Sequence, residues 1–189
     1  MITGILLAAG FGSRFGSNKL LHLLPDGAPI ALAAARNLIA AIPDCVAVVR
    51  PGARELTRVL AAEGFKVVAS THAGKGMGHT LASGVRAARD ASGWVVALAD
   101  MPYIKAETIR RVADELCEGG VIVAPGFAGE RGHPVGFARR FHQELLALTG
   151  DEGARKLIGE HKNSVTVLAL NDPGVLRDID TRADLEQGA

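Results

Sequence analysis

The chain opens with an apolar run, Ile2-Thr-Gly-Ile-Leu-Leu-Ala8, that leads directly into Ala9-Gly10-Phe11-Gly12-Ser13-Arg14. A short apolar run that ends at glycine is typical of a buried strand, and we predict a first strand over Ile2–Ala8. Short apolar runs continue to alternate with longer helical patterns along the chain, as in βαβ units. The sequence therefore predicts an α/β protein with a mainly parallel sheet.

The remaining elements follow from the same patterns. We predict further strands over residues 45–49, 66–69, 93–99, 121–124, 134–137 and 165–170. We predict helices over residues 29–41, 53–63, 78–90, 106–117, 138–148, 151–159 (with Asp151 as its cap) and 184–187. The glycine-rich residues 126–132 are expected to form a loop. With no repeat or linker in view, residues 1–189 are expected to form a single domain.

Composition narrows the class of protein. Hydrophobic residues make up 48% and charged residues 22% of the 189 residues, which is ordinary for a globular domain. The net charge of +1 argues against a general nucleic-acid surface, and no apolar run reaches membrane-spanning length. Cys45 and Cys117 lack metal-ligand spacing and are expected to be small buried hydrophobes. Without a signal peptide or a disulfide framework, we expect a cytoplasmic protein.

The glycine-rich loop after the first strand is a candidate phosphate site. Gly10, Gly12 and Gly16 allow the backbone to approach a ligand closely, and exposed N–H groups in such a loop bind anions. Arg14 and Lys19 would supply the positive charge that a triphosphate needs. Neither the dinucleotide pattern GxGxxG nor the P-loop pattern is present. The alternative is a plain glycine-rich turn with a solvated arginine and lysine.

Asp100 follows the buried run at residues 94–99, where ligands bind in open α/β sheets. A carboxylate at this position suits Mg²⁺, a hard cation that prefers oxygen ligands. The alternative is a cap for the helix that follows. Asp178 and Asp180 share a face if their segment is extended, and either could join Asp100 at the metal. A charged turn that opens the last helix is the competing interpretation.

Two further stretches are candidate ligand contacts. The first is Gly74-Lys-Gly-Met-Gly-His-Thr80, whose glycine content exceeds that of an ordinary helix start, so its backbone could approach a base and ribose. The second, Arg131-Gly-His-Pro134, presents a cation and an imidazole in a loop.

Together these motifs resemble those of the MobA-like nucleotidyltransferases, and most closely the molybdenum cofactor cytidylyltransferases. The similarity spans essentially the whole chain. It is carried, in order, by residues 7–19, Gly76-Met-Gly78, Ala99-Asp-Met-Pro102, Arg131-Gly-His-Pro134, Gly150-Asp-Glu-Gly-Ala-Arg155 and Asp178-Ile-Asp-Thr181. The resemblance implies a three-layer, Rossmann-like sandwich of the nucleotide-diphospho-sugar transferase type. It also implies transfer of a nucleotidyl group from an NTP to a phosphate, with release of pyrophosphate.

The resemblance also implies roles for particular residues. The triphosphate would be held by Ala8, Ala9, Gly10, Gly12, Ser13, Arg14 and Lys19, and the base and ribose would lie against Gly76, Met77, Gly78 and Thr80. Asp100 would bind Mg²⁺, with Asp180 as the second ligand, so that Arg14, Lys19 and Asp100 form the catalytic set. The molybdopterin substrate would face Arg131, His133, Asp151 and Arg155.

The acceptor phosphate is already ionised, so the reaction needs positioning and charge neutralisation and no general base. In the guanylyl branch of the family, the loop sequence is similar to Ala-Gly-Gly where this chain has Ala8-Ala9-Gly10. The methyl group of Ala9 narrows the base pocket, which favours CTP over GTP. A molybdoenzyme is a possible recipient of the product. Two alternatives remain: a cytidylyl- or uridylyltransferase that acts on a sugar or polyol phosphate, and a non-catalytic carrier of molybdenum cofactor.

Overall fold

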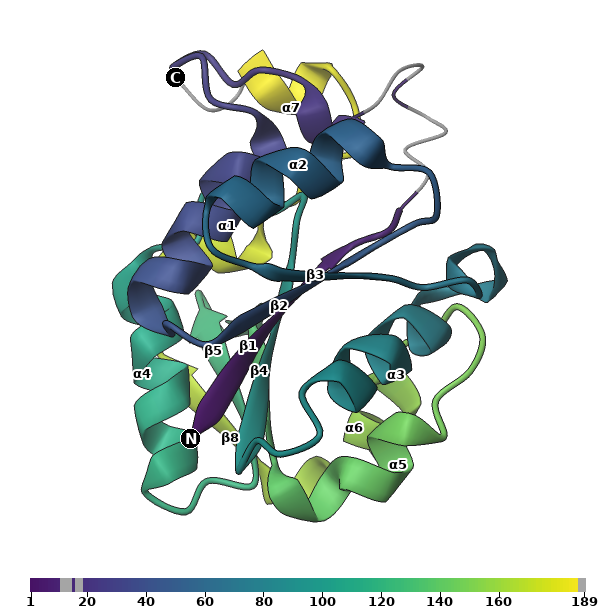
Figure 1. Ribbon diagram of the computed structural model, residues 1–189. Coiled ribbons are helices and arrows are strands. Elements are labelled where there is room, and N and C mark those ends of the chain that lie inside the picture. Colours follow the sequence, from purple (N-terminus) through teal and green to yellow (C-terminus); the bar gives the residue numbers. More distant parts are fainter. Residues whose placement is uncertain (11–14, 16–18, 187–189) are drawn as a thin grey trace.

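The computed structural model describes residues 1–10, 15 and 19–186 (Figure 1). The strands are β1 (Ile2–Ala8), β2 (Cys45–Val49), β3 (Lys66–Ala69), β4 (Gly93–Leu98), β5 (Ile122–Phe127), β6 (Glu130–Arg131), β7 (Val135–Ala138) and β8 (Val165–Ala169). The helices are α1 (Ile30–Ala41), α2 (Arg54–Ala62), α3 (Met77–Ala87), α4 (Ala106–Cys117), α5 (His142–Leu146), α6 (Arg155–Glu160) and α7 (Ala183–Glu186). A short 3-10 helix at Lys19–Leu21 precedes α1.

All eight strands of the described residues belong to one sheet, in the order β3-β2-β1-β4-β7-β5, with β6 and β8 both paired to β5. Strand β1 pairs in parallel with β2 and β4, β2 pairs in parallel with β3, and β8 pairs in parallel with β5. Strand β7 runs antiparallel between β4 and β5. The sheet is therefore largely parallel, as the sequence predicts.

Helices cover both faces of the sheet (Figure 1). Successive side chains of β1 point to opposite faces, so Leu6 belongs to a core cluster with residues of α1, α2 and α4, whereas Ile5 belongs to a second cluster with residues of α3, α5 and α6. Both side chains are fully buried. The three-layer α/β/α arrangement expected from the resemblance is confirmed.

The topology brings distant segments to one edge of the sheet. Parallel β1 and β4 end side by side, because Leu7 pairs with Leu98. Antiparallel β7 begins at this same edge, because Val135 pairs with Val96 near the end of β4. The loop before β7 and the loops after β1 and β4 therefore meet, and α7 lies at the same end of the molecule (Figure 1).

Three local predictions need correction. Residues 126–132 form a hairpin instead of a loop, because Gly126 pairs with Arg131 across a tight turn. The single helix expected over residues 138–148 is interrupted: Arg139–Phe141 is a 3-10 helix and only His142–Leu146 is α-helical, since Ala138 is still paired to β4. Asp151 does not cap a helix, because α6 begins after Ala154.

The cysteines also differ from expectation. Cys45 is buried in β2, where burial raises the pKa of its thiol to about 12, but Cys117 at the end of α4 is exposed. Only one of the two is therefore a buried hydrophobe. Within residues 1–10, 15 and 19–186, no helix has the length and apolar character needed to cross a membrane.

Candidate active site

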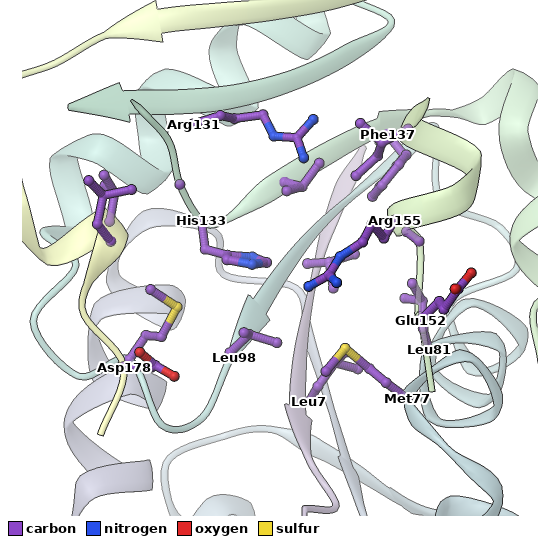
Figure 2. Close-up of a pocket in the computed structure, with 18 residues that line it drawn as sticks. Leu7, Met77, Leu81, Leu98, Arg131, His133, Phe137, Glu152, Arg155 and Asp178 are labelled. Atoms are coloured by element: carbon purple, nitrogen blue, oxygen red, sulfur yellow. The ribbon is translucent and has the colours of Figure 1, made fainter. Parts of the chain in front are cut away.

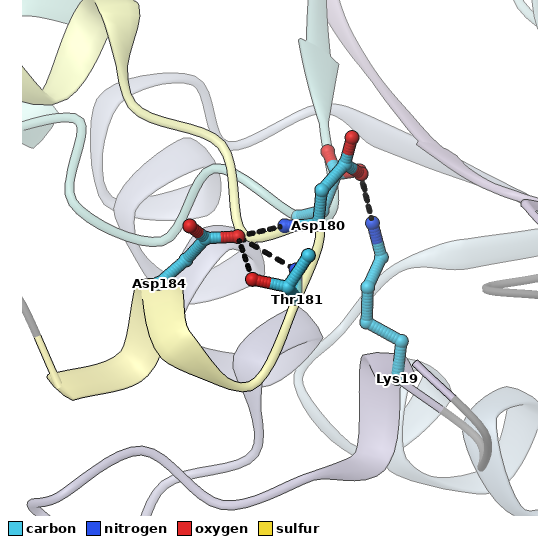
Figure 3. A network of polar contacts seen from close by, with 5 residues as sticks. Lys19, Asp180, Thr181 and Asp184 are labelled. Atoms are coloured by element: carbon cyan, nitrogen blue, oxygen red, sulfur yellow. Dashed lines mark hydrogen bonds and ion pairs between the residues drawn. The ribbon is translucent and has the colours of Figure 1, made fainter. Parts of the chain in front are cut away.

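A lysine joins two carboxylates at the carboxyl edge of the sheet (Figure 3). The Nζ atom of Lys19 lies 2.9 Å from Oδ2 of Asp100 and 3.0 Å from Oδ1 of Asp180. Lys19 comes from the 3-10 helix before α1, Asp100 follows β4, and Asp180 precedes α7. The lysine side chain is only 10% exposed, whereas the side chains of Asp100 and Asp180 are 26% and 46% exposed, so the ammonium is sheltered while the carboxylates remain accessible to water. Residues from three distant parts of the sequence thus form one charged cluster.

Backbone and side-chain hydrogen bonds hold Asp180 in place. The N–H of Ile179 donates to the carbonyl of Asp100 at 2.9 Å, which ties the C-terminal segment to the end of β4. Oδ2 of Asp184 accepts from the N–H groups of Asp180 and Thr181 at 2.9 and 2.6 Å and from the Thr181 hydroxyl at 2.9 Å (Figure 3). This contact resembles a capping box, in which the third residue of a helix reaches back to its start.

The charges in this cluster are reflected in two pKa values. Burial by itself lowers the pKa of Lys19, but hydrogen bonding and charge attraction from Asp100 and then Asp180 outweigh it, so the net pKa is raised. Lys19 is therefore a firmly protonated ammonium. Hydrogen bonds from Thr181 and then Asp180 lower the pKa of Asp184, which keeps this carboxylate ionised in its supporting role.

A pocket of about 310 Å³, here called the glycine pocket, lies beside this cluster. Its lining includes Ala9, Gly10, Thr80 and Asp151, together with Lys19 and Asp100 themselves. Gly74, Gly76 and Met77 complete one wall. A Cβ atom at Gly10 would meet no described atom within 4 Å, so the backbone there is open to the cavity. The glycine pocket thus joins an accessible backbone surface to the charged cluster.

The start of α3 is packed against the turn before α6. Gly76 has φ +117°, and a Cβ atom there would lie 2.2 Å from the carbonyl oxygen of Gly150. The N–H of Gly78 donates to that same oxygen at 2.8 Å, and a Cβ atom on Gly78 would lie 2.5 Å from the carbonyl oxygen of Thr149. Gly78, predicted to face the base and ribose, is thus used for packing, whereas Gly76, Met77 and Thr80 line the glycine pocket.

A second pocket, of about 450 Å³ and here called the arginine pocket, adjoins the first (Figure 2). Its lining includes Arg131, His133 and Arg155 as well as the carboxylates of Glu152 and Asp178. Figure 2 shows the His133 imidazole and the two guanidinium groups around the same space. Three of the four residues predicted to face the acceptor therefore meet here, whereas the fourth, Asp151, lines the glycine pocket.

His133 is held as a neutral imidazole. Burial is the main cause that lowers its pKa; Asp100 opposes the shift and Arg131 adds to it. The backbone N–H of His133 donates to the carbonyl of Val175 at 2.9 Å. Among the described residues its buried Nδ1 atom has no hydrogen-bond partner. The side chain can therefore present an uncharged donor or acceptor to a ligand.

The two pockets share an apolar boundary of Leu7, Met77 and Leu98. Leu7 and Leu98 come from the paired ends of β1 and β4. Met77, the first residue of α3, is 44% exposed and packs on Gly153, where a Cβ atom would lie 3.0 Å from its Sδ atom. Ligands in the two pockets would therefore be separated only by this thin boundary.

The remaining predicted site residues have separate outcomes. Gly12, Ser13 and Arg14 lie outside the described residues. Ala8 is buried at the end of β1. Asp178 and Asp180 diverge, since Asp178 lines the arginine pocket and Asp180 contacts Lys19. Asp184 and the shared apolar boundary were not predicted; the Thr181-x-x-Asp184 spacing of a capping box could have indicated the former.

The architecture and this edge of the sheet define a Rossmann-like α/β protein, a class that binds ligands outside the carboxyl ends of its parallel strands. The chain belongs to the family of MobA-like NTP transferase domains, whose model matches residues 4–165. Asp100 and both pockets lie largely within the matched residues, whereas Asp180 lies beyond them.

Individual relatives agree in length with this chain. The purine catabolism protein PucB of Bacillus subtilis is 33% identical over 191 residues, which cover 95% of this chain and 92% of PucB. The nicotine blue oxidoreductase of Paenarthrobacter nicotinovorans is 26% identical, with the same coverage of 95% and 92%. The crystal structure of Rv0371c from Mycobacterium tuberculosis has a TM-score of 0.83 at 29% identity and covers 98% of this chain and 96% of its own. A structure of Rv0371c in complex with manganese has a TM-score of 0.80.

Proposed function

We propose that this protein is a divalent-metal-dependent nucleotidyltransferase. In this proposal it moves CMP from CTP to the phosphate of molybdopterin cofactor and releases pyrophosphate. The observation that carries the proposal is the pair of adjoining pockets with a lysine and two carboxylates beside them. Group transfer between two bound substrates requires such neighbouring sites, because the reacting atoms must approach to about 3–3.5 Å.

We assign the nucleotide to the glycine pocket. Its open backbone at Gly10 and the ammonium of Lys19 suit an anionic triphosphate. Ala9 is 5% exposed and lines this pocket, so its methyl group reduces the space for a base. This supports a preference for the smaller pyrimidine, and hence for CTP over GTP.

The carboxylates of Asp100 and Asp180 fit a divalent cation. Each places an oxygen within 3.0 Å of a single cationic atom, Nζ of Lys19, so the two already converge on one positive charge. In the described part of the chain no group of three or more His, Cys, Asp or Glu side chains could hold a metal. The pair of carboxylates suits Mg²⁺, which uses one or two carboxylates and takes its remaining ligands from water and phosphates. When bound, the cation would neutralise charge on the phosphates.

We assign the acceptor to the arginine pocket. Arg131 and Arg155 can hold a phosphate, for which guanidinium groups are well suited. Glu152 and Asp178 can accept hydrogen bonds from the N–H groups of a pterin ring, and apolar residues such as Phe137 can contact its faces. This mixture of cations, carboxylates and apolar surface fits a pterin phosphate better than a simple sugar phosphate, which has no flat ring.

The residues of the chain would then act by position and charge. Lys19 neutralises the triphosphate as negative charge shifts toward the departing pyrophosphate. The apolar boundary of Leu7, Met77 and Leu98 limits water between the two substrates. No residue is needed to remove a proton, since the attacking phosphate oxygen is already ionised.

The decisive experiment supplies the protein with molybdopterin cofactor, Mg²⁺ and either CTP or GTP. Pyrophosphate and the dinucleotide product are measured together. We expect both products, with CTP preferred. Pyrophosphate that forms only with sugar or polyol phosphates would move the function to that class of cytidylyl- or uridylyltransferase. Cofactor binding without pyrophosphate from any acceptor would instead favour a carrier.

A further inference from the structure

The position of Lys19 has a consequence for the order in which ligands bind. Its Nζ atom lies between Asp100 and Asp180, the two carboxylates that we assign to the divalent cation. A second cation placed on the same oxygens would lie within a few ångströms of the ammonium. Like charges a few ångströms apart repel even where water partly screens them, and here the Lys19 side chain is 10% exposed while those of Asp100 and Asp180 are 26% and 46% exposed.

We propose that Lys19 is an internal substitute for the metal. Its ammonium occupies the place of the cation and prevents metal binding to Asp100 and Asp180 until a nucleotide binds. Lys19 and Asp100 both line the glycine pocket, so a triphosphate bound there offers the ammonium another negative partner. The lysine then turns to the phosphates, and the carboxylates are released to the cation. This inference rests on the proposed function, since it takes the nucleotide and metal sites from it.

The surrounding structure favours a movement of Lys19 over a movement of the carboxylates. Asp100 is fixed by the end of β4, and its carbonyl accepts from the N–H of Ile179. The backbone of Asp180 is held by Asp184 through two N–H groups and the Thr181 hydroxyl. The lysine, in contrast, reaches the cluster through a long side chain with several rotatable bonds. The backbone that carries the two carboxylates can therefore stay in place while the ammonium moves.

Thermodynamic linkage makes this proposal measurable as a coupling between nucleotide binding and metal binding. If the triphosphate removes Lys19 from the carboxylates, then nucleotide and metal bind cooperatively, and each raises the affinity for the other by the same factor. Removal of the ammonium takes this competitor away from the carboxylates, so the cation should bind more tightly without any nucleotide. The same substitution should weaken the coupling between the two ligands.

The test uses Mn²⁺ alone as the probe, with binding followed by electron paramagnetic resonance in the absence of nucleotide. We expect Lys19→Met to bind Mn²⁺ about fivefold or more tightly than the wild type, which is the lower range of typical coupling. Lys162→Met is the matched control, because Lys162 is an exposed lysine in the 3-10 helix before β8, lines neither pocket, and its loss changes net charge equally. That control should bind Mn²⁺ as the wild type does.

Two further variants keep the test decisive. The double variant Lys19→Met/Asp100→Asn should lose the gain, which would locate the bound Mn²⁺ at the carboxylate pair. If Lys19→Met does not fold, as judged by circular dichroism, Lys19→Gln removes the same charge with a polar side chain. Equal Mn²⁺ affinity in the wild type and the folded neutral variant would overturn the proposal, as would an equal gain in Lys162→Met.

Failure of this proposal can be told apart from failure of the proposed function. If the wild type transfers CMP but neutral variants at position 19 do not gain Mn²⁺ affinity, the substitute role is wrong and the nucleotidyltransferase stands. If the variants gain affinity but no NTP is consumed with any acceptor, the substitute role stands and the proposed reaction is wrong.

Discussion

Asp100 is the residue on which the proposed chemistry most depends. We expect Asp100→Asn to lower Mg²⁺-dependent turnover by about 100-fold or more, the range seen when a group that stabilises transition-state charge is removed. The variant keeps the size and the hydrogen-bonding edge of the side chain, so circular dichroism should show a folded protein. Asp114→Asn, at an exposed position of α4, is the control and should turn over normally. Near-normal turnover in Asp100→Asn would remove Asp100 from the metal site.

At the same scale, the methyl group of Ala9 sets the expected choice of base. Ala9→Gly enlarges the glycine pocket by one methyl group, and we expect the ratio of kcat/KM for CTP to that for GTP to fall by about tenfold. One methylene group in a binding pocket typically changes selectivity by 10–200-fold. Competition assays with both nucleotides measure this ratio. An unchanged ratio would show that base selection lies elsewhere in the pocket.

At the scale of elements, the contact between α3 and the turn before α6 is set by backbone approach. Gly76→Ala places a Cβ atom 2.2 Å from the carbonyl oxygen of Gly150 and forces alanine to φ +117°. We expect the free energy of unfolding to fall by about 1–3 kcal/mol from the backbone strain alone. Gly159→Ala is the control, since that helical glycine has open space around it and alanine there should stabilise by about 0.5–1 kcal/mol. Urea titration measures both variants.

The elements were predicted well where hydrophobic periodicity alone determines them. Strands β1, β2 and β3 and helix α4 have the predicted bounds, since each is an apolar run or a helical repeat closed by a breaker. The prediction fails in β5, which continues through Pro125 and Gly126. Both residues usually end a strand, but a Cβ atom at Gly126 would lie 2.7 Å from the Val167 side chain of β8, so the pairing of β5 with β8 favours glycine here. That contact is tertiary and is not visible in local sequence.

The site residues likewise divide into those that local sequence predicts and those that depend on tertiary contacts. The place of Asp100 could be predicted, because ligands bind at the ends of parallel strands. The role suggested for Asp180 came from the resemblance, and its contact with Lys19 depends on how the C-terminal segment folds back. Gly78 illustrates the limit: its sequence context suggested a ligand contact, which stays a prediction, and the structure shows that a Cβ atom there would meet the backbone of Thr149. A glycine in a motif does not reveal whether its neighbour is a ligand or the chain itself.

At the scale of the whole molecule, the partly buried imidazole of His133 links stability to pH. The pKa of His133 is lowered from its ordinary value of 6.5, so below that pH the unfolded chain binds a proton that the folded protein does not. Stability is therefore lost as pH falls through 6.5. We expect the free energy of unfolding to decline less between about pH 8 and pH 5 in His133→Gln than in the wild type. Denaturant titrations at each pH measure the two slopes; equal declines would show that His133 does not contribute.

The tie between Ile179 and Asp100 also bears on how the protein is made. The described sheet strands and the lining of the glycine pocket precede Asn171 in the chain, but Asp178 of the arginine pocket and one of the two paired carboxylates come after it. During synthesis, a nascent chain that has reached Asn171 therefore has its strands but only half of the carboxylate pair. The backbone hydrogen bond from Ile179 to Asp100 forms only when residue 179 has left the ribosome. The charged cluster is thus completed only after Asp180 has been synthesised, and a product that ends at Asn171 would lack it.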